Sequence, residues 1–266
     1  MSVIAVLVKA SLNPDMVRAE PDGSIDVSAI PLKISDIDRN AIEEAVRLKQ
    51  RLGWKLVTVS VVTWGPVSAR MKDVRLAVQE SLAKGSDEAI VVADDALTPG
   101  DQTLTAKAIK AALERSGIKP QLILAGEATI DEVTSQVPGR LAALLGYSYV
   151  SFARKLEVED GKVIAERDLE DYVEVVEAPL PAVVSVTQEI NEPRPPTLLQ
   201  IRRASRKPIK TFGLRELGDI GKPSRKLLEI KAIQARRKQV IIEGETLEEI
   251  AEKLIEALAK EGVLQL

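Results

Sequence analysis

Four short apolar runs, each followed by a segment with helical spacing, constrain the fold of this chain more than any other feature. The runs are Val3–Val8, Leu56–Val62, Glu88–Ala93 and Gln121–Ala125, and each has the length of a buried strand. Strands that are apolar on both faces are typical of parallel sheets, whose connections are helical. The alternation therefore predicts an α/β fold with a doubly wound, mostly parallel sheet.

The size and composition of the chain fit this fold and narrow its chemistry. A length of 266 residues with 45% hydrophobic content allows one large domain with an appendage. The chain has 0 cysteines and 0 histidines, so it has no disulfide, no cysteine metal site and no Ser-His-Asp arrangement. We therefore predict no catalytic side chain and no metal site, and expect a cofactor to carry any reaction.

Charge and hydropathy argue against two classes of protein. Lys and Arg total 37 against 40 Asp and Glu, and this net charge of -3 argues against a general nucleic-acid binder. No run reaches the roughly 18 apolar residues that span a bilayer, and the N-terminus has the pattern of a strand rather than a signal peptide. We expect a cytoplasmic protein without membrane insertion.

The pattern changes after Gly146. Residues 156–164 alternate about Asp160-Gly161, which predicts a hairpin, and two more strand-like runs follow at 172–177 and 182–186. These runs predict an antiparallel hairpin insertion that closes the domain.

A C-terminal arm follows this domain. From about residue 211 the chain is polar and poorly periodic, until residues 239–243 form a short strand or extended piece. Thr246–Glu249 has the pattern of a capping box and begins an amphipathic helix. We therefore assign residues 1–210 to a nucleotide-binding α/β domain and residues 211–266 to an extended arm.

The loop after the fourth apolar run is a candidate anion site. Residues 126–139 lead from a strand into a helix, so unpaired backbone N–H groups and the helix dipole favour a phosphate there. The polar side chains at this point are Asp131, Thr134, Ser135 and Gln136. The alternative interpretation is a plain helix start with Asp131 as its N-cap.

Other loops are expected at the same edge of the sheet, because ligands of open α/β sheets bind at the carboxyl ends of the strands. Asp38 precedes a helical segment and is either its N-cap or a nucleotide contact. Trp64 follows the second run and is either a lid on the core or one wall of an adenine or flavin pocket. The loops expected to converge span residues 7–9, 35–38, 63–65 and 126–137.

A proline-rich segment at residues 188–197 cannot form a regular element, because it has three prolines in four residues. Leu198, Leu199 and Ile201 follow it, beside a basic cluster. The segment is either a surface linker with one buried leucine or a docking loop for a partner.

In this order, the motifs resemble the beta subunit of electron transfer flavoproteins over nearly the whole chain. The resemblance is carried by Val6–Lys9, Asn40–Lys49, Gly65-Pro66, Gly126–Gln136 and, most specifically, residues 186–198. It implies an adenine-nucleotide α-hydrolase-like fold and an αβ heterodimer. In this family the alpha subunit holds one FAD that carries electrons, and the beta subunit binds AMP or a second FAD.

The resemblance also implies site residues. Asp131, Thr134, Ser135 and Gln136, with backbone amides through Val137, would hold the phosphates, and the adenine would lie against the first two loops. The cofactor-binding residues implied in this way are Leu7, Ser35, Asp36, Ile37, Asp38, Thr63, Trp64, Gly126, Glu127, Ala128, Thr129, Ile130, Asp131, Thr134, Ser135, Gln136 and Val137.

Two departures from the family pattern bear on the cofactor. Residues 35–37 are Ser-Asp-Ile where the family often has Asn-Pro-Phe, and residues 135–137 are Ser-Gln-Val where AMP-binding members have Asn-Gln-Thr. The latter resembles the Ala-Gln-Val of the electron-bifurcating group. A smaller, less polar loop end favours a bridging diphosphate, so we predict FAD, with AMP as the alternative. A bifurcating member would oxidise NADH, passing one electron to the alpha flavin and one to a low-potential acceptor.

The resemblance finally implies partners. Leu198 would anchor in a partner dehydrogenase or quinone reductase, steered by Arg202, Arg203, Arg206 and Lys207, and the C-terminal helix would pack on the alpha subunit. Two rivals remain: a beta subunit whose AMP is purely structural, and a non-redox nucleotide-binding regulator. The regulator would need neither the loop at 187–201 nor the long arm.

Overall fold

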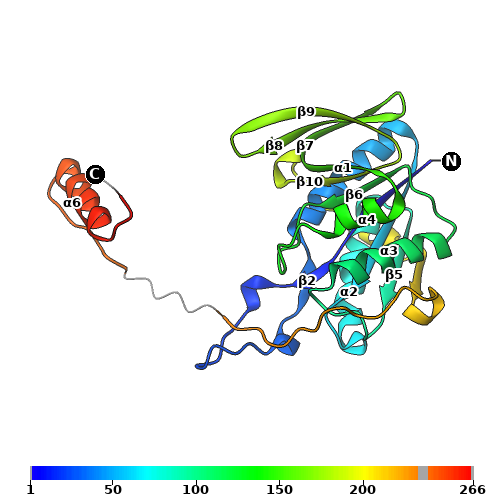
Figure 1. Cartoon of the computed structure of the whole chain (residues 1–266), viewed down its shortest axis with the longest axis horizontal. Helices are drawn as coiled ribbons and strands as arrows, with labels where there is room; N and C mark the ends of the chain where they lie inside the picture. The colour runs from blue at the N-terminus through cyan, green and yellow to red at the C-terminus, as the bar shows by residue number, and fades with distance from the viewer. Residues whose placement is uncertain (1, 233–238, 265–266) are drawn as a thin grey trace. The chain divides into compact units, whose positions relative to one another are not determined.

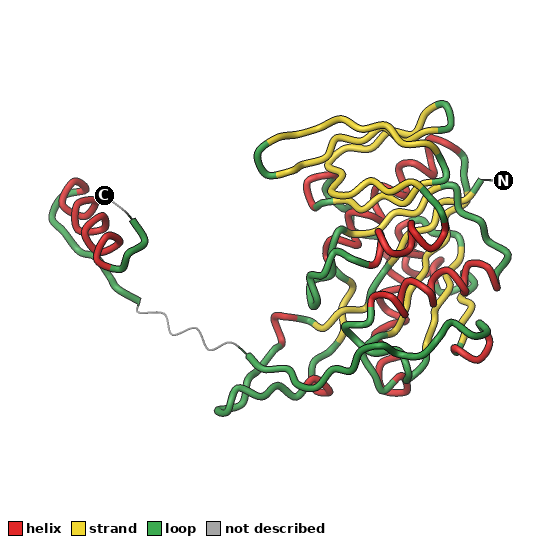
Figure 2. Tube along the Cα trace, viewed as in Figure 1, coloured by secondary structure: helices red, strands yellow, loops and turns green. Residues whose placement is uncertain are grey.

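The computed structural model describes residues 2–232 and 239–264 (Figures 1 and 2). The chain divides into two compact units, Met1–Ile230 and Lys231–Leu266. In the described residues, no helix has the length and apolar content that a membrane crossing requires.

The first unit is built on one nine-stranded sheet in the order β11-β5-β4-β1-β6-β10-β7-β8-β9. Every pairing from β11 to β7 is parallel, and β8 and β9 are antiparallel. The predicted mostly parallel α/β sheet is thereby confirmed. The strands are β1 Val3–Leu7, β4 Lys55–Val62, β5 Glu88–Ala93, β6 Leu122–Gly126, β7 Ser148–Glu159, β8 Lys162–Leu169, β9 Tyr172–Pro179, β10 Ala182–Val186 and β11 Ile209–Phe212.

Helices cover both faces of this sheet. α1 Asp36–Leu52 and α2 Val67–Lys84 pack on one face, and α3 Gln102–Arg115 and α4 Val137–Leu145 pack on the other. Because β4 and β5 lie on one side of β1 and β6 lies on the other, the strand order reverses between β1 and β6. Such a reversal is where ligands bind in this class of sheet.

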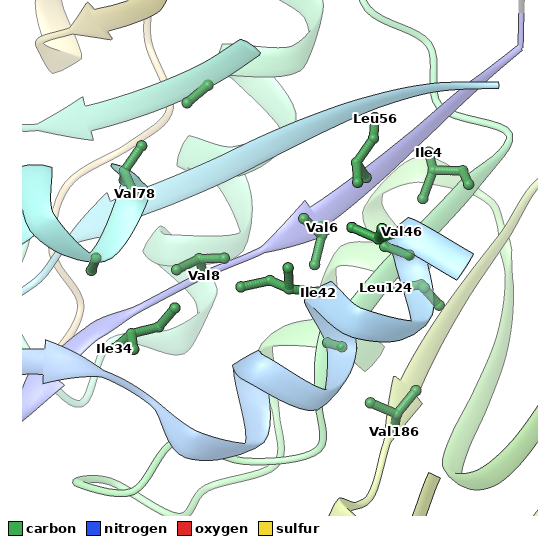
Figure 3. Close-up of a cluster of buried hydrophobic side chains, with 14 of the residues drawn as sticks. Ile4, Val6, Val8, Ile34, Ile42, Val46, Leu56, Val78, Leu124 and Val186 are labelled. Atoms are coloured by element: carbon green, nitrogen blue, oxygen red, sulfur yellow. The ribbon is translucent and has the colours of Figure 1, made fainter. Parts of the chain in front are cut away.

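The core follows from the alternation of side chains along each buried strand. In β1, Ile4 and Val6 face α1 and α2, whereas Ala5 and Leu7 face α3 and α4. Figure 3 shows Ile4, Val6 and Leu124 of the sheet against Ile42 of α1. Burial of aliphatic surface on both faces stabilises the sheet by roughly 25 cal/mol per Å².

A second, two-stranded sheet lies between β1 and α1 in the sequence, and the residue patterns did not predict it. β2 Ala10–Leu12 pairs antiparallel with β3 Leu32–Ile34, and two short 3-10 segments, Pro14–Met16 and Val27–Ala29, lie between them. The buried guanidinium of Arg70 holds this excursion, because it donates to the carbonyls of Ile30 (2.7 Å) and Val27 (2.6 Å).

The antiparallel insertion matches its prediction. β7 pairs with β8 through Glu159 and Lys162 on either side of the expected Asp160-Gly161 turn, and β9 completes the extension at the top of Figure 1. Gly161 has a φ of 78°, which a glycine adopts without steric cost.

Residues that follow position 210 also pack on the first unit. β11 is the edge strand beside β5. The 3-10 segment Leu214–Glu216 follows it, and both Leu214 and the C-cap residue Leu217 pack on the core. This polar stretch lacks periodicity because its order comes from contacts with the sheet. The first unit therefore continues to Ile230.

The second unit contains α6 Leu247–Lys260. Its predicted N-cap is present, because the Thr246 hydroxyl accepts a hydrogen bond from the Glu249 N–H at 3.2 Å. None of the residues of α6 is buried, and Leu247 is 81% exposed. Residues 239–243 form no strand in the described part of the chain, and residues 233–238, 265 and 266 of the predicted arm lie outside it.

Candidate functional site

A pocket opens where the strand order reverses, at the carboxyl ends of β1 and β6. Its volume is about 700 Å³, part of which is open solvent. Leu7, Val8 and Lys9 line it from the end of β1, residues 125–129 from the end of β6, and residues 134–138 from the start of α4.

The pocket has an apolar floor and a polar rim. Leu7, Val59, Val61, Ile109 and Ala125 line the floor, and all five belong to the half of the core that α3 and α4 cover. A planar ring system fits such a floor, while polar groups at a rim fix a ligand's orientation.

The structure brings most of the predicted cofactor residues together at this pocket. Ser35, Asp36 and Ile37 do not line it: Ser35 is the buried N-cap of α1, Asp36 pairs with Lys33 and Arg39, and Ile37 packs beneath Gly126. The predicted residues that do line it are Leu7, Asp38, Thr63, Gly126, Glu127, Ala128, Thr129, Thr134, Ser135, Gln136 and Val137; those that do not are Ser35, Asp36, Ile37, Trp64, Ile130 and Asp131.

Sequence reasoning missed one wall of the pocket. Gly100, Asp101, Gln102 and Thr105 line it from the loop after β5 and the first turns of α3. Asp101 is the N-cap of α3 and accepts a hydrogen bond from the Leu104 N–H at 3.0 Å. The sequence pattern could have indicated this wall, because the loop after the third strand of a parallel sheet reaches the same edge of the sheet as the loops after the other three strands.

Asp38 lies within the first turn of α1 and is not its N-cap, because Ser35 occupies that position. Its buried carboxylate accepts the Lys9 N–H at 2.7 Å and ties the end of β1 to the helix. Burial raises the pKa of Asp38 to about 7, against the lowering effect of hydrogen bonds from the Lys9 and Gly126 backbone. A Cβ at Gly126 would lie 2.8 Å from Asp38 Oδ1, so any larger residue here would have to displace the Asp38 carboxylate.

Asp131 and Trp64 contact each other and do not line the pocket. α4 begins at Val137 with Gln136 at its N-cap position, so Asp131 does not cap it. The Asp131 side chain is 3% exposed and accepts the indole N–H of Trp64 at 2.7 Å. Burial tends to raise the pKa of Asp131, but the Lys9 charge and hydrogen bonds from Thr129, Lys9 and Trp64 lower it below its usual value.

The backbone between Asp131 and α4 is in an uncommon conformation. Val133 has a φ of 46° and Ser135 a φ of 52°, which are left-handed values that side chains disfavour. Left-handed residues alternating with other conformations turn successive N–H groups toward one concavity, the arrangement that binds anions. Strain of this kind persists where the surrounding structure holds the loop firmly.

The charges around the pocket limit which anion it accepts. Of the described residues that line it, Lys9 carries the positive charge, whereas Asp38, Asp101, Glu127 and Glu132 are acidic. Lys9 Nζ is engaged with Asp131 (3.0 Å) and with Glu132, and Glu132 also accepts the Gly100 N–H at 2.6 Å. An anion would therefore bind to backbone amides and to the Thr134 and Ser135 hydroxyls rather than to a cationic side chain. The buried Thr63 hydroxyl has no hydrogen-bond partner in the described chain.

The proline-rich segment is mounted on α1. Asn40 donates to the carbonyls of Gln188 (3.0 Å) and Asn191 (2.7 Å), and Glu43 accepts Arg194 Nε at 2.7 Å. Buried polar side chains on a core-facing helix are costly unless they are hydrogen-bonded. Asn40 and Glu43 are 5% and 2% exposed, so they replace the backbone pairing that the prolines prevent.

A short helix, α5 Leu198–Ala204, follows this segment in place of a loop, with the capping box Thr197/Gln200 at its start. Leu198 is 86% exposed, and Arg202 and Arg203 lie in its last turn. Lys207 does not join them as a steering charge. Its Nζ donates to the carbonyls of Leu82 (2.8 Å) and Ser86 (2.6 Å) at the end of α2.

Comparison with known proteins identifies proteins that are similar to this chain over most of its length. A family model described as an electron transfer flavoprotein domain matches residues 23–217. The chain is also 32% identical over 270 aligned positions to electron transfer flavoprotein subunit beta of Thermoanaerobacterium thermosaccharolyticum, and the alignment covers 98% of this chain and 99% of that protein.

Proposed function

Because the chain belongs to the electron transfer flavoprotein family, as a beta subunit, we propose that its pocket between β1 and β6 binds FAD. The observation that carries this proposal is an apolar floor beside a loop whose amides and hydroxyls can donate hydrogen bonds to a phosphate. When bound there, FAD would supply one- and two-electron redox chemistry. The chain's own residues bind and orient the cofactor and limit its access to water.

The phosphates bind at residues 134–137, through backbone amides and the Thr134 and Ser135 hydroxyls. Helix α4 begins at Val137, so its dipole adds to the attraction. A planar ring system of the bound FAD would lie on Val59, Val61 and Ile109 rather than against residues 35–37, which do not reach the pocket. Thr63 offers a buried hydroxyl at the same floor.

FAD is favoured over AMP by the charges of the rim. A terminal monophosphate carries about -1.5 to -2 at pH 7, whereas each phosphate of a bridging diphosphate carries one negative charge. Besides Asp38, whose pKa of about 7 leaves it partly protonated, three acidic residues line the pocket, and its lysine is already paired, so the higher local charge of a monophosphate is disfavoured. The apolar Val137, where AMP-binding members have threonine, acts in the same direction.

The second part of the proposal concerns partners. The chain pairs with an alpha subunit, and the exposed apolar stripe of α6, which includes Leu247, Leu254 and Ile255, is covered in that heterodimer. Leu198 anchors in a partner dehydrogenase or quinone reductase, with Arg202 and Arg203 attracted to acidic groups around the partner's pocket. The hydrogen bonds that Asn40 and Glu43 of α1 make hold the segment before Leu198 in place before docking, which lowers the conformational entropy lost on binding.

With FAD in the beta site, the heterodimer holds two flavins and takes its electrons from NADH by bifurcation. The test is to purify the chain with its alpha subunit and to measure flavin and AMP per heterodimer. Two FAD support the proposal. One FAD with one AMP would replace it by simple electron transfer with a structural nucleotide, and a heterodimer without flavin would overturn it.

A further inference from the structure

The loop that carries the anion-binding backbone is held by one buried carboxylate. Asp131 accepts four hydrogen bonds, two on each carboxylate oxygen. Oδ2 accepts the Leu12 N–H (3.1 Å) and Trp64 Nε1 (2.7 Å), and Oδ1 accepts Lys9 Nζ (3.0 Å) and Thr129 Oγ1 (2.7 Å). A carboxylate has about four acceptor positions, so Asp131 is saturated by the protein itself.

Three of these donors come from outside the loop. Lys9 and Leu12 follow β1 and belong to the excursion that contains β2, and Trp64 follows β4. Asp131 therefore ties the loop after β6 to the ends of two other strands. Glu132 adds a tie to a third, because it accepts the Gly100 N–H after β5 and contacts Lys9.

A saturated, buried carboxylate is not available to a ligand, and its charge would repel a phosphate. Trp64 is 6% exposed and does not line the pocket. Asp131 nevertheless comes two residues before Val133, and Trp64 is hydrogen-bonded to Asp131, so both act where the segment with positive φ values at Val133 and Ser135 begins. A valine in that conformation is strained unless neighbouring contacts hold it.

We infer that Trp64 and Asp131 are positioning residues, which hold residues 133–136 in the conformation that turns the backbone N–H groups after Val133 toward the phosphates of a bound nucleotide; the Val133 N–H itself donates to the Thr129 carbonyl at 3.0 Å. The inference rests on the proposed function, since it concerns the same pocket. It assigns specificity for phosphorylated ligands to an indole N–H and a carboxylate that do not touch the ligand.

The test compares ligands with and without a phosphate. The full-length chain, freed of nucleotide, is titrated calorimetrically with AMP, FAD and adenosine. Trp64→Phe keeps an aromatic ring but removes the N–H donor to Asp131. We expect AMP and FAD to bind about tenfold more weakly to this variant, while the dissociation constant for adenosine changes less than about twofold.

Trp54→Phe is the matched control. Trp54 packs against the core just before β4, at the opposite end of the strand from Trp64, and its replacement should change none of the three affinities. Asp131→Asn is the second variant if Trp64→Phe fails to fold, because it retains the size of the side chain but weakens the bonds to Lys9 and Trp64. It should show the same selective loss for AMP and FAD.

Three results would overturn the inference. Unchanged AMP affinity in a folded Trp64→Phe or Asp131→Asn chain would show that the loop keeps its conformation without this contact. An equal loss for adenosine and AMP would show a general effect on the pocket. If the unaltered chain binds neither AMP nor FAD, alone or with its alpha subunit, the proposed function and this inference fail together.

Discussion

Replacement of Asp38 by asparagine should change how the stability of the chain depends on pH. Asp38 is 4% exposed, and burial raises the pKa of its carboxyl from 3.8 to about 7 in the folded chain. Between these values native Asp38 keeps a proton that the unfolded chain has released. The native state then binds more protons than the unfolded state, so the stability of the unaltered chain falls as pH rises through this interval.

The size of the effect follows from the width of the interval. It spans roughly three pH units, from 3.8 to about 7, and one unit corresponds to about 1.4 kcal/mol. As pH rises through this interval, the free energy of unfolding of the unaltered chain therefore falls by up to about 4 kcal/mol, a decrease that Asp38→Asn does not show. The asparagine amide also faces the Gly126 N–H and loses its hydrogen bond, but that cost is the same at every pH and leaves the slope unchanged.

Urea denaturation of both chains at half-unit steps from about pH 4 to pH 9 measures the effect. The free energy of unfolding of Asp38→Asn minus that of the unaltered chain should increase up to about pH 7 and become constant above about pH 8. Asp36→Asn removes a carboxyl from the same helical turn and controls for the loss of one negative charge. A difference for Asp38→Asn that stays constant between pH 5 and pH 8 would refute the reasoning.

Three further substitutions test the rest of the structure. Leu198→Ala should slow electron exchange with the partner dehydrogenase about tenfold or more, because burial of a leucine that is 86% exposed is worth about 1.5–3 kcal/mol. Leu228→Ala, at an equally exposed leucine, is the control. Loss of bound nucleotide in Leu198→Ala would contradict the docking assignment. Gly126→Ala should lower the free energy of unfolding in urea by about 1–3 kcal/mol, because its Cβ would lie 2.8 Å from Asp38 Oδ1; no change would mean that this approach relaxes freely. Asn40→Ala removes the side-chain donor to two carbonyls of the proline-rich segment, at a cost of about 1–3 kcal/mol. Amide hydrogen exchange should become faster at residues 188–191 but not in β6, and uniformly faster exchange would show global destabilisation instead.

Local patterns predicted the regular part of the fold. Glu88–Ala93 is a strand with the predicted ends, and the helical segments expected after the four apolar runs are present as α1, α2, α3 and α4. These predictions succeed because periodicity and caps are properties of neighbouring residues. β2, β3 and β11 were missed, because three- and four-residue strands carry little pattern of their own and form only where a partner strand is placed beside them.

The predicted site was less complete than the predicted fold. The rule that ligands bind at strand ends located the pocket, but it did not show which side chains face it. Gly100, Gln102 and Thr105 were overlooked because no motif marks them. Trp64 and Asp131 carried the strongest chemical signals, yet they contact each other and do not line the pocket.

The sequence by itself determined the alternation of strands and helices, the edge of the sheet that holds the pocket and, through the ordered motifs, the family. Only the tertiary structure decided which polar groups are free for a ligand. Asp131 is saturated by donors from residues 2 to 122 positions away, and Lys207 is held by carbonyls more than 120 positions away. The availability of a polar group depends on these distant partners, because a carboxylate or an ammonium group that is already hydrogen-bonded in the interior has no capacity left for another molecule.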